Sequence, residues 1–208
     1  MPAGSAAEDF NAPPTVLAAL RNATASHHHA IEDLLPLSRD LTLAGYVQVM
    51  RGFEAFLAVW EPRVAAALPE RLRPWLAQRS RYALARGDLH RLGAPPVLAP
   101  PDGLQQLRIP GTAAAFGSLY VMEGSALGGQ VIAPRLERHL NLKAESGAGY
   151  LAGWGPRTGA MWREFRERLE YEVGGSERAR AEACNAAKQT FDALGATFRE
   201  VLRDSVPA

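Results

Sequence analysis

The sequence predicts an all-α fold, a single-domain bundle of about seven or eight helices, and three observations support this class. Apolar residues recur at helical spacing along most of the 208-residue chain. No segment alternates between apolar and polar residues for long enough to indicate a β-strand. The length of the chain and its 47% hydrophobic fraction suffice for one buried core, so one domain is the default.

Start and stop signals place the first two helices. The first should run from Pro13 to about Leu35 and end at Pro36, because proline lacks the amide donor and clashes with the preceding turn. Thr42 is a typical N-cap residue for the second helix, which carries one stripe of aromatic and aliphatic residues. Pro62 should end or kink this second helix.

The later elements follow from the same rules. Helical spacing continues over residues 70–92, 112–140, 158–173 and 177–204. A proline-dense segment, 93–112, precedes the second of these helical stretches. A glycine-rich segment, 141–158, precedes the third. Both segments are expected to be connectors without regular structure. The helix that precedes residue 141 is expected to continue past Pro134.

Charge and cysteine content exclude several classes of protein. The chain has 23 Lys and Arg residues against 22 Asp and Glu residues, a formal net charge of +1, so no general affinity for nucleic acid is expected. Cys184 is the only cysteine, which excludes an intrachain disulfide and a cysteine zinc site. No secretory signal and no apolar run of membrane-spanning length is apparent. We therefore expect a cytoplasmic protein that binds neither nucleic acid nor membrane, with residues 1–12 as a disordered tail and residues 13–205 as the domain.

The first candidate for chemistry is a histidine run on the first helix. His28 falls within or at the edge of the buried stripe, as does His27, whereas His29 faces water. Glu32 lies one turn after His28 on the same side. A buried imidazole whose second nitrogen is oriented by an acceptor suits an iron or zinc ligand. A core histidine paired with a helix neighbour is the alternative, and the helix alone favours it.

The second candidate is the glycine-rich stretch in the 112–140 helix. Gly124, Gly128 and Gly129 together cost about 3 kcal/mol relative to alanine in a helix interior, so the helix needs a reason to keep them. One reason is close packing against another helix, and the other is a backbone without side chains that lies against a flat ligand. Alone, the stretch favours close packing. Together with the histidine, it fits a planar metallocycle held between two helices.

These two motifs resemble those of the haem oxygenase family, in particular its bacterial members often found beside bacteriophytochromes. The stretch from Leu20 to Glu32 is similar to the family's pattern around the haem-ligating histidine. The stretch from Gly124 to Gln130 is similar to the family's distal-helix motif, which bends over the haem. The resemblance implies that His28 is the iron ligand and that Glu32 is its partner.

Further site residues are implied by the resemblance alone. Besides Glu32, the residues expected to contact the haem are Arg21, Thr24, Tyr120, Arg163, Arg166, Phe191 and Phe198. The arginines would pair with the haem propionates, and Arg166 is a better match than Arg163. The distal residues expected to serve catalysis are Gly124, Ser125, Gly128 and Gly129.

Ser125 departs from the family's usual pattern. Many members have an aspartate at this position, which orders the water chain that delivers protons during the reaction. A serine hydroxyl can hold a water molecule, but it carries no negative charge at neutral pH. The departure puts the route of proton delivery in question and leaves the prediction of haem binding in place.

The resemblance also implies an activity and a set of partners. The activity is oxidative cleavage of haem to biliverdin, carbon monoxide and ferrous iron, with haem as both substrate and cofactor. The reaction needs dioxygen and electrons from a separate reductase or ferredoxin, and a bacteriophytochrome is one expected acceptor of the biliverdin. One alternative is a haem carrier of the same fold without turnover. Another is a thiaminase-like helical enzyme that binds a different planar substrate.

A stretch with six arginines, from Arg71 to Arg91, is a candidate docking surface for an acidic electron donor. An ordinary solvent-exposed helix explains the same stretch more simply.

Overall fold

The computed structural model describes residues 15–35, 37, 41–95, 97 and 101–203, and within these ranges the chain forms eight α-helices and no strand. The α-helices are α1 (Val16–Leu34), α2 (Leu43–Ala67), α3 (Arg73–Ala77), α4 (Tyr82–Arg91), α5 (Thr112–Leu140), α6 (Gly149–Ala152), α7 (Thr158–Val173) and α8 (Glu177–Arg203). The predicted all-α class is confirmed. The expected tail, and the prolines predicted to bound the first helix, lie outside the described residues.

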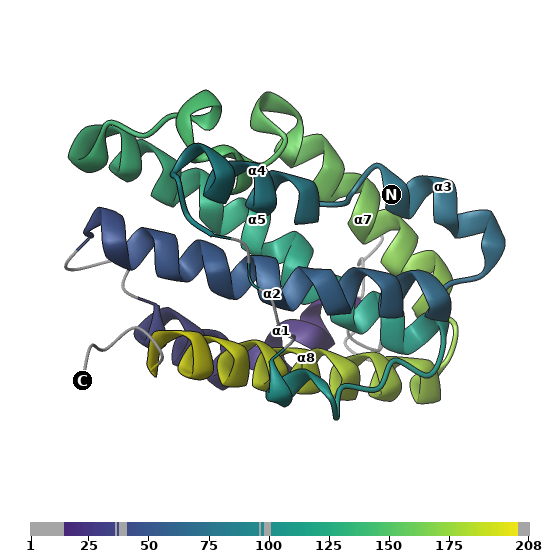
Figure 1. The fold of residues 1–208 in the computed structure, drawn as a ribbon. Coiled ribbons are helices and arrows are strands. Elements are labelled where there is room, and N and C mark those ends of the chain that lie inside the picture. The colour runs from purple at the N-terminus through teal and green to yellow at the C-terminus, as the bar shows by residue number, and fades with distance from the viewer. Residues whose placement is uncertain (1–14, 36, 38–40, 96, 98–100, 204–208) are drawn as a thin grey trace, which may run out of the picture.

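The longest helix, α5, is the centre of the bundle. It packs against α8, α7, α6 and α2, while α1 lies along α8 (Figure 1). Helix α2 runs between the α1 and α8 pair and the short helix α4 (Figure 1). This arrangement places the N-terminal helix and the middle of α5 on opposite sides of one space, which α8 closes.

The predicted caps and several predicted boundaries are confirmed. The Thr42 hydroxyl accepts a hydrogen bond from the amide of Gly45 at 3.0 Å, as expected of an N-cap residue. Helix α5 begins at Thr112 and continues past Pro134 to Leu140, as its hydrophobic spacing predicts. Helix α7 likewise spans the predicted 158–173 range.

Of the two outcomes predicted for Pro62, an end of the helix is wrong. The helix continues for five residues beyond the proline, to Ala67. Trp60 and Val64, on either side of Pro62, are buried in the core, and the Trp60 indole donates a hydrogen bond to the Ser118 hydroxyl at 2.7 Å. Burial of these side chains offsets the cost of the missing backbone hydrogen bond.

The 141–158 segment is more regular than predicted, because it contains the short helix α6. The amides of Gly149 and Tyr150 donate hydrogen bonds to the two carboxylate oxygens of Asp88, at 3.0 and 2.7 Å. Asp88 belongs to α4 and is fully buried. A cap supplied by a distant helix leaves no signal in the local sequence, which explains why the segment reads as a loop.

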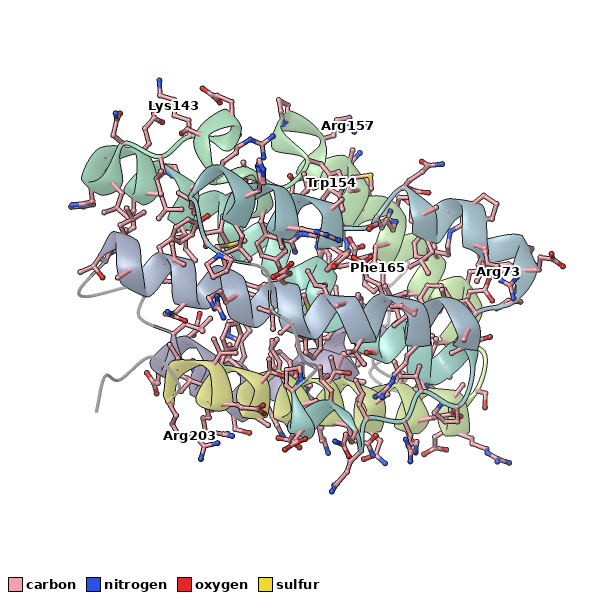
Figure 2. The ribbon with its side chains drawn as sticks, in the orientation of Figure 1. Arg73, Lys143, Trp154, Arg157, Phe165 and Arg203 are labelled. Atoms are coloured by element: carbon pink, nitrogen blue, oxygen red, sulfur yellow. The ribbon has the colours of Figure 1, made fainter. Side chains whose placement is uncertain are left out.

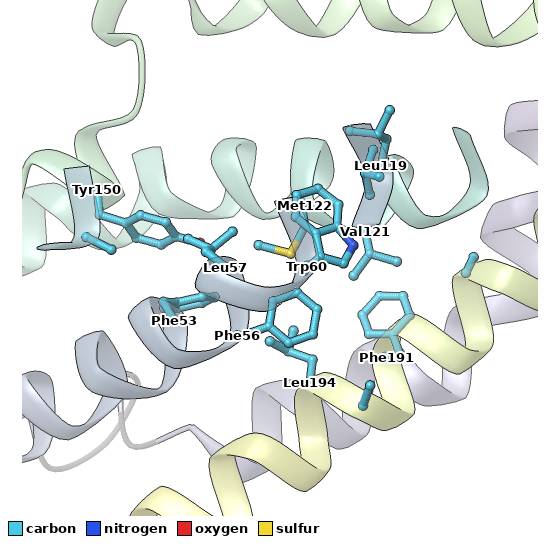
Figure 3. Packing of buried hydrophobic residues seen from close by; sticks show 14 of the residues in the cluster. Phe53, Phe56, Leu57, Trp60, Leu119, Val121, Met122, Tyr150, Phe191 and Leu194 are labelled. Atoms are coloured by element: carbon cyan, nitrogen blue, oxygen red, sulfur yellow. The ribbon is translucent and has the colours of Figure 1, made fainter. Parts of the chain in front are cut away.

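The core runs along the facing sides of α2, α5 and α8. In Figure 3, Phe191 of α8 lies opposite Val121 of α5, and the ring of Phe53 lies beside that of Tyr150. The Phe53 and Tyr150 ring centroids are 4.5 Å apart. Among the helices that the structure describes, none combines the length and the apolar character needed to cross a membrane.

Candidate functional site: a cleft between α1 and α5

A cleft of about 270 Å³ lies between α1 and the middle of α5, with α8 at its base. Its lining residues come from six of the helices and from the segment that follows α1, and they are mostly apolar. They are Arg21, His28, Ile31, Glu32, Leu35, Leu37, Phe53, Tyr120, Val121, Gly124, Ser125, Leu127, Gly128, Gly129, Ile132, Tyr150, Leu151, Trp162, Phe191 and Leu194. Apolar walls with a few polar groups are typical of sites for small organic ligands.

On the α1 side, His28 faces the cleft. Its Nδ1 atom is 3.3 Å from a carboxylate oxygen of Glu32, so the contact predicted from the one-turn spacing is present. The ring also lies edge-on to Phe191, with centroids 6.2 Å apart. A carboxylate that accepts from Nδ1–H would leave the lone pair on Nε2, the nitrogen available to a metal.

The expectation that His28 is buried is wrong. Its side chain is 60% exposed, because it borders an open cleft instead of another helix. The most sheltered of the three histidines is His27, which is 27% exposed and lies 3.8 Å from Asp192 of α8. His29 faces water, as predicted, and is 78% exposed.

On the α5 side, two of the glycines present bare backbone to the cleft, and the third allows close packing against another helix. A Cβ atom added to Gly124 or Gly128 would meet no atom within 4 Å, because both face the open cleft. A Cβ atom on Gly129 would lie 2.5 Å from the backbone oxygen of Leu151. Two glycines therefore expose bare backbone to the cleft, and the third permits close packing against α6.

Ser125, the residue that departs from the family motif, lines the cleft and is tied to a buried arginine. Its hydroxyl donates a hydrogen bond to the Met122 carbonyl and accepts one from the Arg81 guanidinium, each at 2.8 Å. Arg81 is only 2% exposed. It also donates to the Tyr150 carbonyl at 2.9 Å, and its guanidinium carbon lies 3.9 Å from the centroid of the Tyr150 ring.

Sequence reasoning placed Arg81 in a solvent-exposed basic stretch, and the structure corrects this. Arg79 is buried as well, 2.8 Å from the Glu123 carboxylate. Arg71 is exposed and pairs with Glu172. Arg73 is the first residue of α3 and lies at one end of the molecule (Figure 2). The six arginines therefore do not form one exposed patch, because the helix turn between α3 and α4 points two of them inward.

Two residues predicted to contact the haem lie elsewhere. Thr24 is buried, and its hydroxyl donates to the Leu20 carbonyl of the same helix at 2.8 Å. Phe198 is buried between Phe53, at 5.0 Å between ring centroids, and the backbone of Gly52. It packs behind the wall of the cleft, whereas Phe191, two helical turns earlier, lines it.

Of the three arginines predicted to contact the haem propionates, one lines the cleft and two do not. Arg21 lines the cleft and is exposed to solvent. Arg163 and Arg166 are exposed on α7 and are not among the lining residues. Arg166 lies one turn after Trp162, which does line the cleft, so these two share one side of α7. Tyr120 lines the cleft as predicted.

Phe53 and Trp162 are lining residues that sequence reasoning did not assign to the site. Phe53 belongs to the apolar stripe of α2 and carries no signal that separates it from the core. Trp162 precedes Arg163 by one residue and Arg166 by four. The spacing of four residues, about one helical turn, could have indicated that Trp162 belongs to the site. Among the described residues, no three His, Cys, Asp or Glu side chains are grouped so that they could hold a metal ion.

Comparisons with known proteins point to one family. The family model described as "Heme oxygenase" matches residues 98–202. A curated relative, "Heme oxygenase" from Xanthomonas campestris pv. campestris (strain 8004), is 36% identical over 148 residues, which cover 70% of this chain and 84% of the relative. The fold matches the NO- and CO-bound structures of the haem oxygenase from Neisseria meningitidis, with a TM-score of 0.73, 23% identity, and coverage of 94% of this chain and 96% of that one. The chain belongs to the haem oxygenase family of haem-degrading enzymes.

Proposed function

We propose that this chain binds haem in the cleft between α1 and α5 and converts it to biliverdin, carbon monoxide and ferrous iron. The observation that carries the proposal is that His28 and the bare backbone at Gly124 and Gly128 line the same cleft. An imidazole on one wall and bare backbone at two glycines on the other suit a flat ring with a metal at its centre. Bound haem supplies the iron at which dioxygen reacts and the ring that is oxidised, with electrons from a reductase or ferredoxin.

The residues of the cleft fit such a ligand in three respects. His28 would hold the iron through Nε2, since Glu32 occupies the Nδ1 side. Arg21, exposed at the cleft, would pair with a propionate. Phe191, Trp162 and the other apolar lining residues would exclude water from the faces of the ring. Arg166 is proposed as a second propionate partner because it lies one turn from Trp162.

The release of biliverdin, as opposed to another cleavage product, rests on the family resemblance. The same holds for a bacteriophytochrome as its acceptor, which stays a prediction. The glycine wall supports a fixed orientation of the ring, because it allows the α5 backbone to approach the ligand closely on one side only.

Two experiments test the proposal. Haem titration followed at the Soret band should give a histidine-ligated spectrum that His28→Ala abolishes and His29→Ala retains; the same loss in His27→Ala, with His28→Ala unaffected, would contradict the assignment. Addition of ascorbate or ferredoxin and an iron chelator should then replace the Soret band with biliverdin absorbance. A Soret band that does not change under these conditions would instead indicate a haem carrier.

A further inference from the structure

A buried carboxylate on α4, that of Asp88, holds a segment that lies some sixty residues further along the chain. Its two oxygens accept hydrogen bonds from the amides of Gly149 and Tyr150. Its ion pair with Arg91 is long, at 3.8 Å, and that arginine is half exposed. Burial raises the pKa of the Asp88 carboxyl despite the two amide donors. A carboxylate in this place is costly to the fold, so its presence calls for an explanation.

Helix α6 needs support from outside because it has only four residues, Gly149–Ala152. A helix of this length does not form by itself in water. A second buried side chain holds the residues just before it, since the Tyr46 hydroxyl of α2 donates a hydrogen bond to the Gly147 carbonyl at 2.8 Å. Side chains from α2 and α4 therefore fix the backbone of this segment at Gly147, Gly149 and Tyr150.

Helix α6 in turn supports one wall of the cleft. Tyr150 and Leu151 both line it, and the Tyr150 ring packs against that of Phe53. The Leu151 carbonyl oxygen lies so close to Gly129 of α5 that a Cβ atom there would be 2.5 Å from it. The two backbones are thus in direct contact, with no side chain between them to absorb a displacement.

This contact is next to the part of α5 that faces the cleft. Gly129 directly follows Gly128, which presents bare backbone to the space where a ligand would lie. A displacement of α6 therefore changes the position of this backbone. Only an ionised carboxylate can hold α6 in the observed way, because two separate oxygens accept from two amides. An asparagine would turn a donor toward one of them.

We propose that Asp88 is a positioning residue of the haem cleft: by holding α6 against α5, its carboxylate fixes the place of the glycine wall opposite His28. The cost of the buried charge is thereby explained, because it sets the geometry of a binding site. This inference rests on the proposed haem-binding function of the cleft.

The first test measures amide hydrogen exchange in the protein without haem. Asp88→Asn replaces one buried hydrogen bond by a contact between two donors, so exchange at residues 149–152 should become about tenfold faster. Exchange at residues 124–129 of α5 should also become faster, to a smaller extent. Faster exchange at 149–152 with no change at 124–129 would overturn the inference, because Asp88 would then hold α6 alone.

The matched control is Glu54→Gln. Glu54 of α2 is also a buried carboxylate that accepts a hydrogen bond from a distant amide, that of Val97, at 3.1 Å, and it does not line the cleft. Its substitution should leave exchange in both segments unchanged. Equal acceleration of residues 124–129 in the two variants would show a general loss of stability and overturn the inference.

The second test uses the protein loaded with haem, reduced and placed under carbon monoxide. The C–O stretching band, recorded by infrared spectroscopy, reports the groups around the bound gas and does not depend on turnover. Asp88→Asn should shift or broaden this band and weaken haem binding about tenfold, whereas Glu54→Gln should match the unmodified protein in both. A lowered melting temperature of Asp88→Asn with an unaltered band would show a purely structural role and overturn the inference.

If Asp88→Asn does not fold, Tyr46→Phe takes its place, since Tyr46 holds the same segment through Gly147 and does not line the cleft. It should alter exchange at residues 124–129 and the C–O band in the same sense, and no change in either would overturn the inference. Failure of the unmodified protein to bind haem would instead overturn the proposed function. The exchange test needs no haem, so the two failures are distinguishable.

Discussion

Gly128 of α5 and His28 of α1 line opposite walls of a single cleft. A Cβ atom on Gly128 would meet no atom of the protein within 4 Å. The space in front of this glycine is therefore available to a ligand. Gly129, the next residue, is by contrast packed against the Leu151 carbonyl. Neighbouring glycines of one motif thus serve binding and packing separately.

Substitution of these two glycines should separate binding from stability. Gly128→Leu fills the cleft, so haem affinity should fall about tenfold or more, while the fold should gain up to ~1 kcal/mol from helix propensity. Gly129→Ala places a methyl group 2.5 Å from a backbone oxygen and should cost ~1–3 kcal/mol of unfolding free energy. Soret titration and denaturant unfolding measure the two effects. If Gly128→Leu binds haem as tightly as the unmodified protein, the ligand does not lie against this wall.

The two aromatic residues of α8 should respond differently to truncation. Phe198→Leu leaves a cavity between α8 and α2 and should destabilise the fold by ~1–3 kcal/mol, with haem affinity little changed, because the side chain does not line the cleft. Phe191→Leu should weaken haem binding more than it weakens the fold. The measurement is again a haem titration beside an unfolding curve for each variant, and a larger loss of affinity in Phe198→Leu would contradict this assignment.

Substitution of only one partner of the Arg79–Glu123 ion pair should lower the unfolding free energy strongly. Both side chains are buried, at 1% and 4% exposure, and Arg79 also donates to the Met161 carbonyl at 3.0 Å. Arg79→Met leaves the Glu123 charge buried without its partner, which should lower the unfolding free energy by ~3–5 kcal/mol at neutral pH. The double variant Arg79→Met, Glu123→Leu should recover much of this loss, and denaturant titrations of all four proteins give the coupling energy.

Glu123 should also make stability depend on pH. Burial raises the pKa of its carboxyl above 4.5, and this effect exceeds the opposing effect of Arg79. Between about pH 4.5 and the pKa of the folded state, the folded protein therefore holds a proton that the unfolded protein has lost. The contribution of Glu123 to stability falls as pH rises through this range, and it is constant above the folded-state pKa. The difference in unfolding free energy between the unmodified protein and Glu123→Gln should follow this course. A difference that grows with pH would show that the pKa is lowered instead.

The sequence predicts the long helices well because their signals are local. The bounds of α5 and α7 follow from hydrophobic spacing within the helices themselves. Helix α6 escapes prediction because Asp88, which caps it, belongs to another helix. Pro62 is misjudged because the packing of Trp60 and Val64 is a tertiary effect that outweighs the local rule.

The candidate site, too, could be predicted only where its signals are local. His28, Gly124 and Gly128 were predicted from motifs, and all three line the cleft. Phe198 shares a face of α8 with Phe191, but about 10 Å of helix axis separates the two, and Phe198 packs against Phe53 instead of lining the cleft. Arg81 has no local signal either, since only the turn that precedes α4 decides that it points inward.

The Asp88 contact with α6 links one wall of the cleft to a helix that does not line it. It holds Gly149 and Tyr150 against α4, while Leu151 is wedged against Gly129, so the α5 wall is braced by two neighbours. The opposite wall, α1, rests on α8 and α7 and exposes His28 and Glu32 to solvent. The position of the α5 wall therefore depends on α4, through Asp88 and α6, although α4 contributes no lining residue to the cleft.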